Sequence, residues 1–177
     1  MRDGAARGFD NRATMPLVNT ALENPPLVWD KMAPAILWGG LIAGAMDITA
    51  AFVTAGLRGV SPVRVLQYVA SGSLGPASFE KGAVSATLGM VIHFFIAFSA
   101  TTVFYVASRK IAFLTQRAAT AGVLYGVAVY LMMYWVVTPL SAVRRGPVTW
   151  NSTIIAVLTH IFCVGLPIAL SVRRFSK

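Results

Sequence analysis

Four long apolar stretches constrain this chain more than any other feature of its sequence. They cover residues 33–57, 82–108, 118–139 and 152–172, and each holds about 20 or more mainly apolar residues. A helix of that length crosses a hydrocarbon core of about 30 Å. In lipid, backbone polar groups must be bonded within their own segment, and none of the stretches alternates as a barrel strand would. The sequence therefore predicts an all-α integral membrane protein, a bundle of four transmembrane helices.

The composition agrees with lipid as the solvent. The 177 residues are 56% hydrophobic and 12% charged, whereas soluble domains carry roughly 25% charged residues. The net charge of +9 would suit nucleic-acid binding in a soluble protein, but here the basic residues lie in tails and connections between apolar stretches. Topogenic signals and contacts with anionic lipid headgroups explain this placement. We therefore expect the lipid bilayer, and no nucleic acid, as a partner.

The tails and connections predict the orientation of the chain. Residues 1–32 show no helical or strand period, which predicts a flexible cytoplasmic tail ahead of a membrane domain at 33–177. With the N-terminus inside, the inner side holds 10 basic residues and the outer side holds 5: Arg2, Arg7, Arg12, Lys31, Arg109, Lys110, Arg117, Arg173, Arg174 and Lys177 inside, against Arg58, Arg64, Lys81, Arg144 and Arg145 outside. Because basic residues favour the cytoplasmic side, both termini are predicted to be cytoplasmic.

The connection 58–81 has a pattern of its own. Ser61 and Pro62 form a helix start, a capping hydroxyl followed by proline at the first helical position. Apolar residues then recur at helical spacing until Gly72. The pattern predicts a short amphipathic outer interfacial helix at about 62–71. Two roles stay open for it, a stiff connector or a lid over an outward-facing cavity.

Glycine pairs mark one face of the first and third apolar stretches. They are Gly40 with Gly44, and Gly122 with Gly126, while the second and fourth stretches each carry one histidine. Small residues allow membrane helices to approach one another closely, so we expect these glycines to serve helix packing within the bundle. A homodimer face is the alternative. The repetition also suggests two similar helical hairpins, one with an insertion.

Three ionisable residues lie deep inside the predicted spans. Counting residues from the outer ends places Asp47, His93 and His160 roughly 14–18 Å below those ends, with Tyr130 in the same layer. A charge at such depth is costly in lipid, so each group should face the bundle interior and have a partner. The sequence therefore predicts an intramembrane polar cluster of Asp47, His93, His160 and Tyr130.

Several roles are open for this cluster. A hydrogen bond between Asp47 and a histidine would fix the register of two helices. A proton or substrate relay is a second role, because an aspartate beside a histidine titrates near neutral pH. His93 and His160 at equal depth would also suit the two axial positions of a single haem b, and one aspartate with two histidines would suit zinc or iron. The glycine-rich pieces match neither a P-loop nor a dinucleotide fingerprint, and no catalytic residue is predicted.

Four pieces of the sequence carry a family resemblance: LWGGLIAGAMDITAAFV, GVSPVRVLQYVASGSLG, LGMVIHFFIAF and HIFCVGLPIAL. Over about residues 35–172 the chain resembles a family of small uncharacterised bacterial inner-membrane proteins. Its layout is also similar, more loosely, to that of the YagU-like inner-membrane proteins. The resemblance implies a multi-pass location in the bacterial inner membrane and four helices, and it implies no activity.

Together these observations favour a non-enzymatic membrane protein. Its polar Asp/His interior would support small-solute or proton-linked transport, or sensing. The alternatives are a redox or assembly subunit with one haem b, and a purely structural partner in a homo-oligomer or a larger membrane complex.

Overall fold

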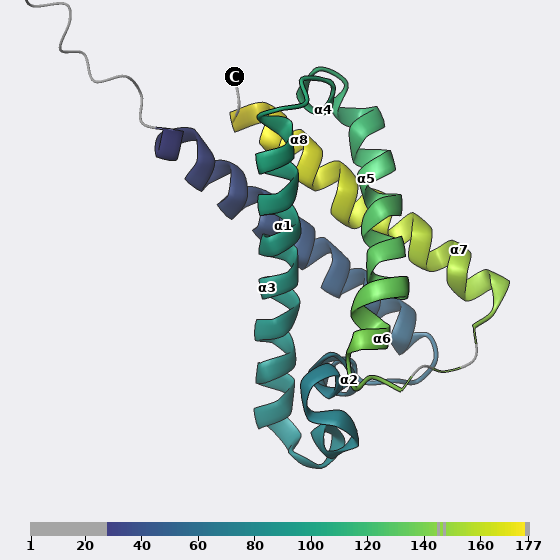
Figure 1. Cartoon of the computed structure of the whole chain (residues 1–177). Helices are drawn as coiled ribbons and strands as arrows, with labels where there is room; N and C mark the ends of the chain where they lie inside the picture. The colour runs from purple at the N-terminus through teal and green to yellow at the C-terminus, as the bar shows by residue number, and fades with distance from the viewer. Residues whose placement is uncertain (1–27, 145, 147, 176–177) are drawn as a thin grey trace, which may run out of the picture.

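The computed structural model describes residues 28–144, 146 and 148–175 (Figure 1). Within these residues the chain is helical and has no strand. Four of its helices are long and apolar enough to cross a membrane: Lys31–Gly56, Gly82–Ser108, Ala118–Leu140 and Trp150–Phe175. This confirms the all-α prediction and the number of long apolar helices. Most of the predicted tail, residues 1–27, lies outside the described residues.

The first two long helices follow the predicted spans closely. Helix α1 comprises Val28–Gly56, and α3 comprises Gly82–Ser108. The α3 bounds agree with the predicted 82–108. Helix α1 begins before the predicted residue 33, because a helix does not have to end where the apolar sequence ends.

The third and fourth long helices each contain a π-helical segment. The third consists of α5 (Ala118–Met132), η2 (Met133–Val137) and α6 (Thr138–Leu140). The fourth consists of α7 (Trp150–Thr159), η3 (His160–Gly165) and α8 (Leu166–Phe175). Pro139 and Pro167 follow the two π segments and have no N–H to donate to the preceding turn. At the end of η2 the Met133 carbonyl accepts both the Thr138 N–H and the Thr138 hydroxyl, the latter at 2.7 Å.

The connection after α1 folds as helix α2, Pro62–Leu74, followed by the 3-10 helix η1, Gly75–Glu80. The Ser61 hydroxyl accepts from the Arg64 N–H at 3.3 Å, and Pro62 occupies the first turn, as the sequence predicts. The helix continues beyond residue 71 to Leu74 and is capped by Gly75, whose φ of 62° favours glycine. Helix α2 packs against α3 and lies at the opposite end of the bundle from the short helix α4, Phe113–Gln116 (Figure 1).

A tightly packed core fills the α4 end of the bundle. Phe104 of α3 and Ile168 and Val172 of α8 are almost completely buried there. Met32 of α1 and Phe175 of α8 pack against the same cluster, so both ends of the described chain lie at this end (Figure 1).

All four predicted packing glycines face other helices of the same chain. A Cβ added at Gly44 would meet the Phe94 ring at 2.7 Å, and one added at Gly40 would meet the Phe98 ring. At Gly122 and Gly126 the nearest atoms belong instead to the backbone of η3 and α8. The glycines therefore allow α1 to approach α3, and α5 to approach the fourth long helix.

Candidate functional site

A cavity of about 300 Å³ lies in the bundle beside α2, and Asp47, His93 and His160 all line it. The three residues come from α1, α3 and η3, and each is half-buried. The tertiary structure therefore brings together three ionisable groups that are far apart in sequence. Most of the remaining wall is apolar: Ala43, Ile48, Ala51, Val65, Val69, Ile96, Ala97, Ala100, Val129, Met133 and Val164, with Tyr68.

His93 is held by the backbone of α1. Its Nε2 lies 2.9 Å from the Gly44 carbonyl oxygen. A carbonyl oxygen only accepts, so Nε2 is the nitrogen that carries the proton. Gly44 has no side chain, which lets α3 come close enough for this contact. In the neutral imidazole, Nδ1 therefore remains a proton acceptor.

His160 is held by its own helix. Its Nδ1 lies 2.8 Å from the Ala156 carbonyl oxygen, so Nδ1 carries the proton and Nε2 is the acceptor when the ring is neutral. Tyr130 does not line the cavity, but its ring meets the His160 ring edge-on at a centroid distance of 5.7 Å. Tyr130 also stacks on Tyr134 at 5.9 Å. It thus contacts one member of the predicted cluster from outside the cavity.

Asp47 differs from the two histidines in its hydrogen bonding. Among the residues that the structure describes, its carboxylate forms no hydrogen bond and no ion pair. The direct Asp–His hydrogen bond considered from the sequence is therefore replaced by two histidine contacts to backbone carbonyls. The His93 ring reaches a carbonyl of the neighbouring helix α1, and the His160 ring reaches a carbonyl one turn back in its own helix. The Asp47 side chain lines the cavity instead.

The arrangement has one chemical consequence. In each neutral imidazole the N–H donates to a backbone carbonyl, and an ionised carboxylate only accepts hydrogen bonds. The remaining polar atoms of these three cavity residues are the Asp47 carboxylate oxygens, Nδ1 of His93 and Nε2 of His160. All of them accept protons or hydrogen bonds. Such a cavity suits a proton, or a small solute that brings hydrogen-bond donors.

Helix α2 supplies one wall of the cavity through Val65, Tyr68 and Val69. These residues were not predicted as site residues. Their i, i+3, i+4 spacing on an amphipathic helix was the available signal, since it defines one apolar face. From the sequence alone, this face could equally lie on the membrane surface or cover a cavity.

Tyr68 also connects the cavity to a second space. A cleft of about 590 Å³ at the α2 end shares Ala51, Val65 and Tyr68 with the cavity, and Arg58 and Arg64 line it. At the other end, the Tyr125 hydroxyl donates to the Ala100 carbonyl at 2.7 Å, next to the packed core. The cavity therefore adjoins an arginine-lined cleft on one side and close-packed side chains on the other.

The cluster does not make a metal centre. Within the described part of the chain, no three His, Cys, Asp or Glu side chains are close enough to hold a metal ion. For haem b, both rings would have to offer a nitrogen to one iron, and the nitrogens that the carbonyl contacts leave as acceptors are Nδ1 of His93 and Nε2 of His160. No feature of the cavity favours haem over a small solute.

Comparison of the chain with protein-family models, curated proteins and solved structures found no match.

Proposed function

We propose that this chain is a non-enzymatic, multi-pass membrane protein that transports or senses a small solute, or protons, through its Asp/His cavity. One observation carries the proposal: Asp47, His93 and His160, from three different long helices, line a single cavity. Ionisable groups inside membrane helices are rare and mark ion and proton pathways. Among the described residues the Asp47 carboxylate has no hydrogen-bond or ion-pair partner, which argues against a purely structural role, because a structural carboxylate at this depth should have one.

The four long apolar helices support insertion in a membrane. We place the chain in the bacterial inner membrane, as the family resemblance implies, with both termini in the cytoplasm. The described basic residues support this orientation, because the end with α4 and both chain ends carries six of them: Lys31, Arg109, Lys110, Arg117, Arg173 and Arg174. The cleft with Arg58 and Arg64 would then face the periplasm.

Proton flux tests the proposal. The purified protein is reconstituted in vesicles that contain a pH-sensitive dye, and a potassium diffusion potential drives protons inward. We expect flux above that of empty vesicles, and Asp47→Asn should reduce it to the empty-vesicle rate, because the amide cannot take up a proton. His93→Gln and His160→Gln should reduce it less, since each removes one of several acceptors.

Glu80→Gln is the matched control. It makes the same carboxylate-to-amide change at an exposed residue of η1, away from the cavity lining. This variant should keep the full flux. Equal flux in Asp47→Asn and the unchanged protein, with both folded, would contradict a proton role for the cavity. A sensing role would then require that Asp47→Asn change the binding of a solute instead.

A further inference from the structure

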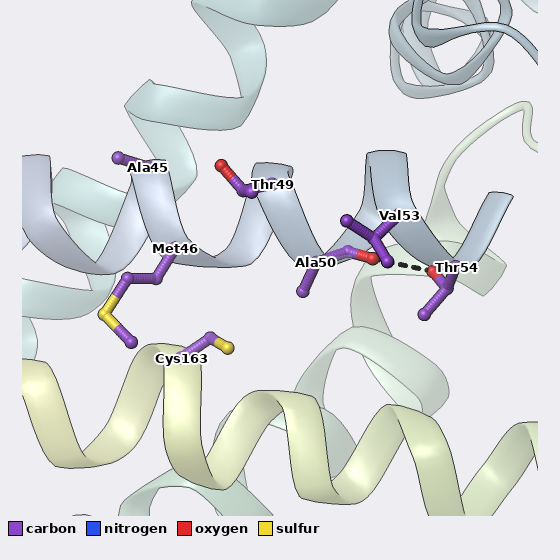
Figure 2. Close-up of a pocket in the computed structure, with 7 residues that line it drawn as sticks. All are labelled: Ala45, Met46, Thr49, Ala50, Val53, Thr54 and Cys163. Atoms are coloured by element: carbon purple, nitrogen blue, oxygen red, sulfur yellow. Dashed lines mark hydrogen bonds between the residues drawn. The ribbon is translucent and has the colours of Figure 1, made fainter. Parts of the chain in front are cut away.

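A second hollow lies on the outside of the bundle, along the α2-side half of α1. It has a volume of about 540 Å³ and is lined by Ala45, Met46, Thr49, Ala50, Val53, Thr54 and Cys163. Figure 2 shows Met46 on α1 facing Cys163 on the fourth long helix across this groove. The groove exists because α1 packs on α8 and η3, whereas α7 diverges from it.

The groove is mostly apolar, and the polar groups among its lining residues are the Thr49 and Thr54 hydroxyls and the Cys163 thiol. The one hydroxyl near its α2 end, that of Thr54, donates to the Ala50 carbonyl of its own helix at 2.8 Å (Figure 2). From Ala45 to Thr54 the helix rises about 14 Å. One leaflet of a bilayer has a hydrocarbon thickness of about 15 Å, half of the 30 Å core. The groove therefore has the length of one acyl layer.

The groove leads into the arginine-lined cleft, because Thr54 lines both. Arg58 follows Thr54 by one helical turn, at the level where a lipid headgroup would lie. Arg64 is held in place by Phe79: its Nη1 donates to the Phe79 carbonyl at 3.4 Å, and its guanidinium lies 4.3 Å from the ring centroid. Of the described residues that line the cleft, none is a carboxylate.

We propose that the groove and the cleft together bind an anionic glycerophospholipid. The phosphate would lie between Arg58 and Arg64, and one acyl chain would lie along the groove between α1 and the fourth long helix. Guanidinium groups match phosphate oxygens in geometry and charge, and the absence of a carboxylate on the cleft wall leaves their charge uncompensated. The inference rests on the proposed membrane insertion, and it does not depend on proton flux.

Native mass spectrometry of the full chain tests this directly. The delipidated protein in detergent is mixed with phosphatidylglycerol, with phosphatidylcholine of the same acyl chains, or with glycerol phosphate. We expect retention of phosphatidylglycerol above the other two compounds. Arg58→Gln and Arg64→Gln should each weaken retention about fivefold, because a basic residue near an anionic lipid surface contributes about that factor.

A groove variant separates the acyl chain from the headgroup. Ala50→Phe fills the groove and should reduce phosphatidylglycerol retention while both arginines remain. The controls are Val103→Phe, on an exposed face of α3, and Arg109→Gln with Lys110→Gln, at the opposite end of the bundle. Both controls should retain the lipid as the unchanged protein does.

Two results would overturn the proposal. Equal retention of phosphatidylglycerol and phosphatidylcholine would show that the arginines do not select the headgroup. Binding of glycerol phosphate as tight as that of the lipid would show that the groove holds no acyl chain. The arginine variants alter exposed side chains only, so they decide the matter even if Ala50→Phe does not fold. Lipid retention is measured without a gradient, so its failure is distinct from a failure of transport.

Discussion

At Gly126 the absence of a side chain decides how closely two long helices approach. A Cβ at this position would lie 2.6 Å from the His160 carbonyl oxygen and 2.6 Å from the Ile161 Cα. Both are backbone atoms, which cannot rotate away. Gly40 also lacks room for a Cβ, but there the obstacle is the Phe98 ring, a side chain with rotational freedom.

This difference predicts unequal effects of the same substitution. Gly126→Ala should destabilise the protein by about 1–3 kcal/mol, the usual cost of overpacking. Gly40→Ala should cost less than Gly126→Ala, because the Phe98 side chain can yield more than backbone atoms can and alanine favours the helix. Unfolding of each purified variant in mixed micelles, followed by circular dichroism, measures both. Equal losses at the two positions would contradict the assignment of the η3 contact as rigid.

Among the elements, the short helix α2 closes one side of the candidate site. It supplies Val65, Tyr68 and Val69 to the cavity wall, and it docks on α3 where Gly89 faces the Leu66 backbone. A Cβ at Gly89 would lie 2.8 Å from the Leu66 carbonyl carbon. The absence of a side chain at Gly89 therefore allows α2 to lie this close to α3, and with it the cavity wall.

Gly89→Ala should therefore displace α2 while leaving the four long helices assembled. We expect faster proteolysis within residues 62–74 and a changed proton flux, because the wall next to Tyr68 has moved. Gly56→Ala is the matched control: Gly56 is also helical, and an added Cβ there has nothing within 4 Å. Limited proteolysis of both variants in vesicles compares them. A Gly89→Ala protein with unchanged cleavage would show that α2 tolerates the shift.

The two hairpins also resemble each other at the scale of elements. In the first, Gly44 of α1 contacts His93 of α3 through the imidazole. In the second, Gly126 of α5 adjoins His160 of η3 through the backbone. Each histidine thus lies beside the second glycine of its partner helix, which agrees with the hairpin repetition predicted from the sequence. The η3 segment makes the second contact different, because a π turn shifts the residues that face α5.

For the molecule as a whole, the packed core at the α4 end separates the cavity from the side where both chain ends lie. Phe104 is 1% exposed and meets the Tyr125 ring at a centroid distance of 4.9 Å. Under the proposed transport function this packing would have to open, because the described residues place the arginine-lined cleft at the other end of the cavity.

Phe104→Ala should weaken this barrier and raise the basal proton leak in vesicles. Replacing a fully buried phenylalanine by alanine also costs about 3–5 kcal/mol of stability, so the variant is measured at low temperature. Val103→Ala is the control, because it truncates an exposed neighbour on the same helix. A leak that is the same in both variants would place the barrier elsewhere.

The sequence by itself determined the number and length of the long helices and the cap of α2. Apolar length and the Ser61–Pro62 start act within one segment, so they can be read without knowing its neighbours. It also indicated that Asp47, His93 and His160 lie at one depth, because helical rise converts residue counts into height. The glycine pairs indicated the faces where helices approach, because small residues allow close packing.

Only the tertiary structure decided what these residues contact. The carbonyls of Gly44 and Ala156 bond the two imidazoles, and no pattern in the sequence marks which backbone oxygen lies in reach. The wall that α2 contributes and the groove beside α1 likewise arise between elements far apart in the chain. The physical reason is that depth follows from rise along one helix, whereas partners follow from how several helices cross.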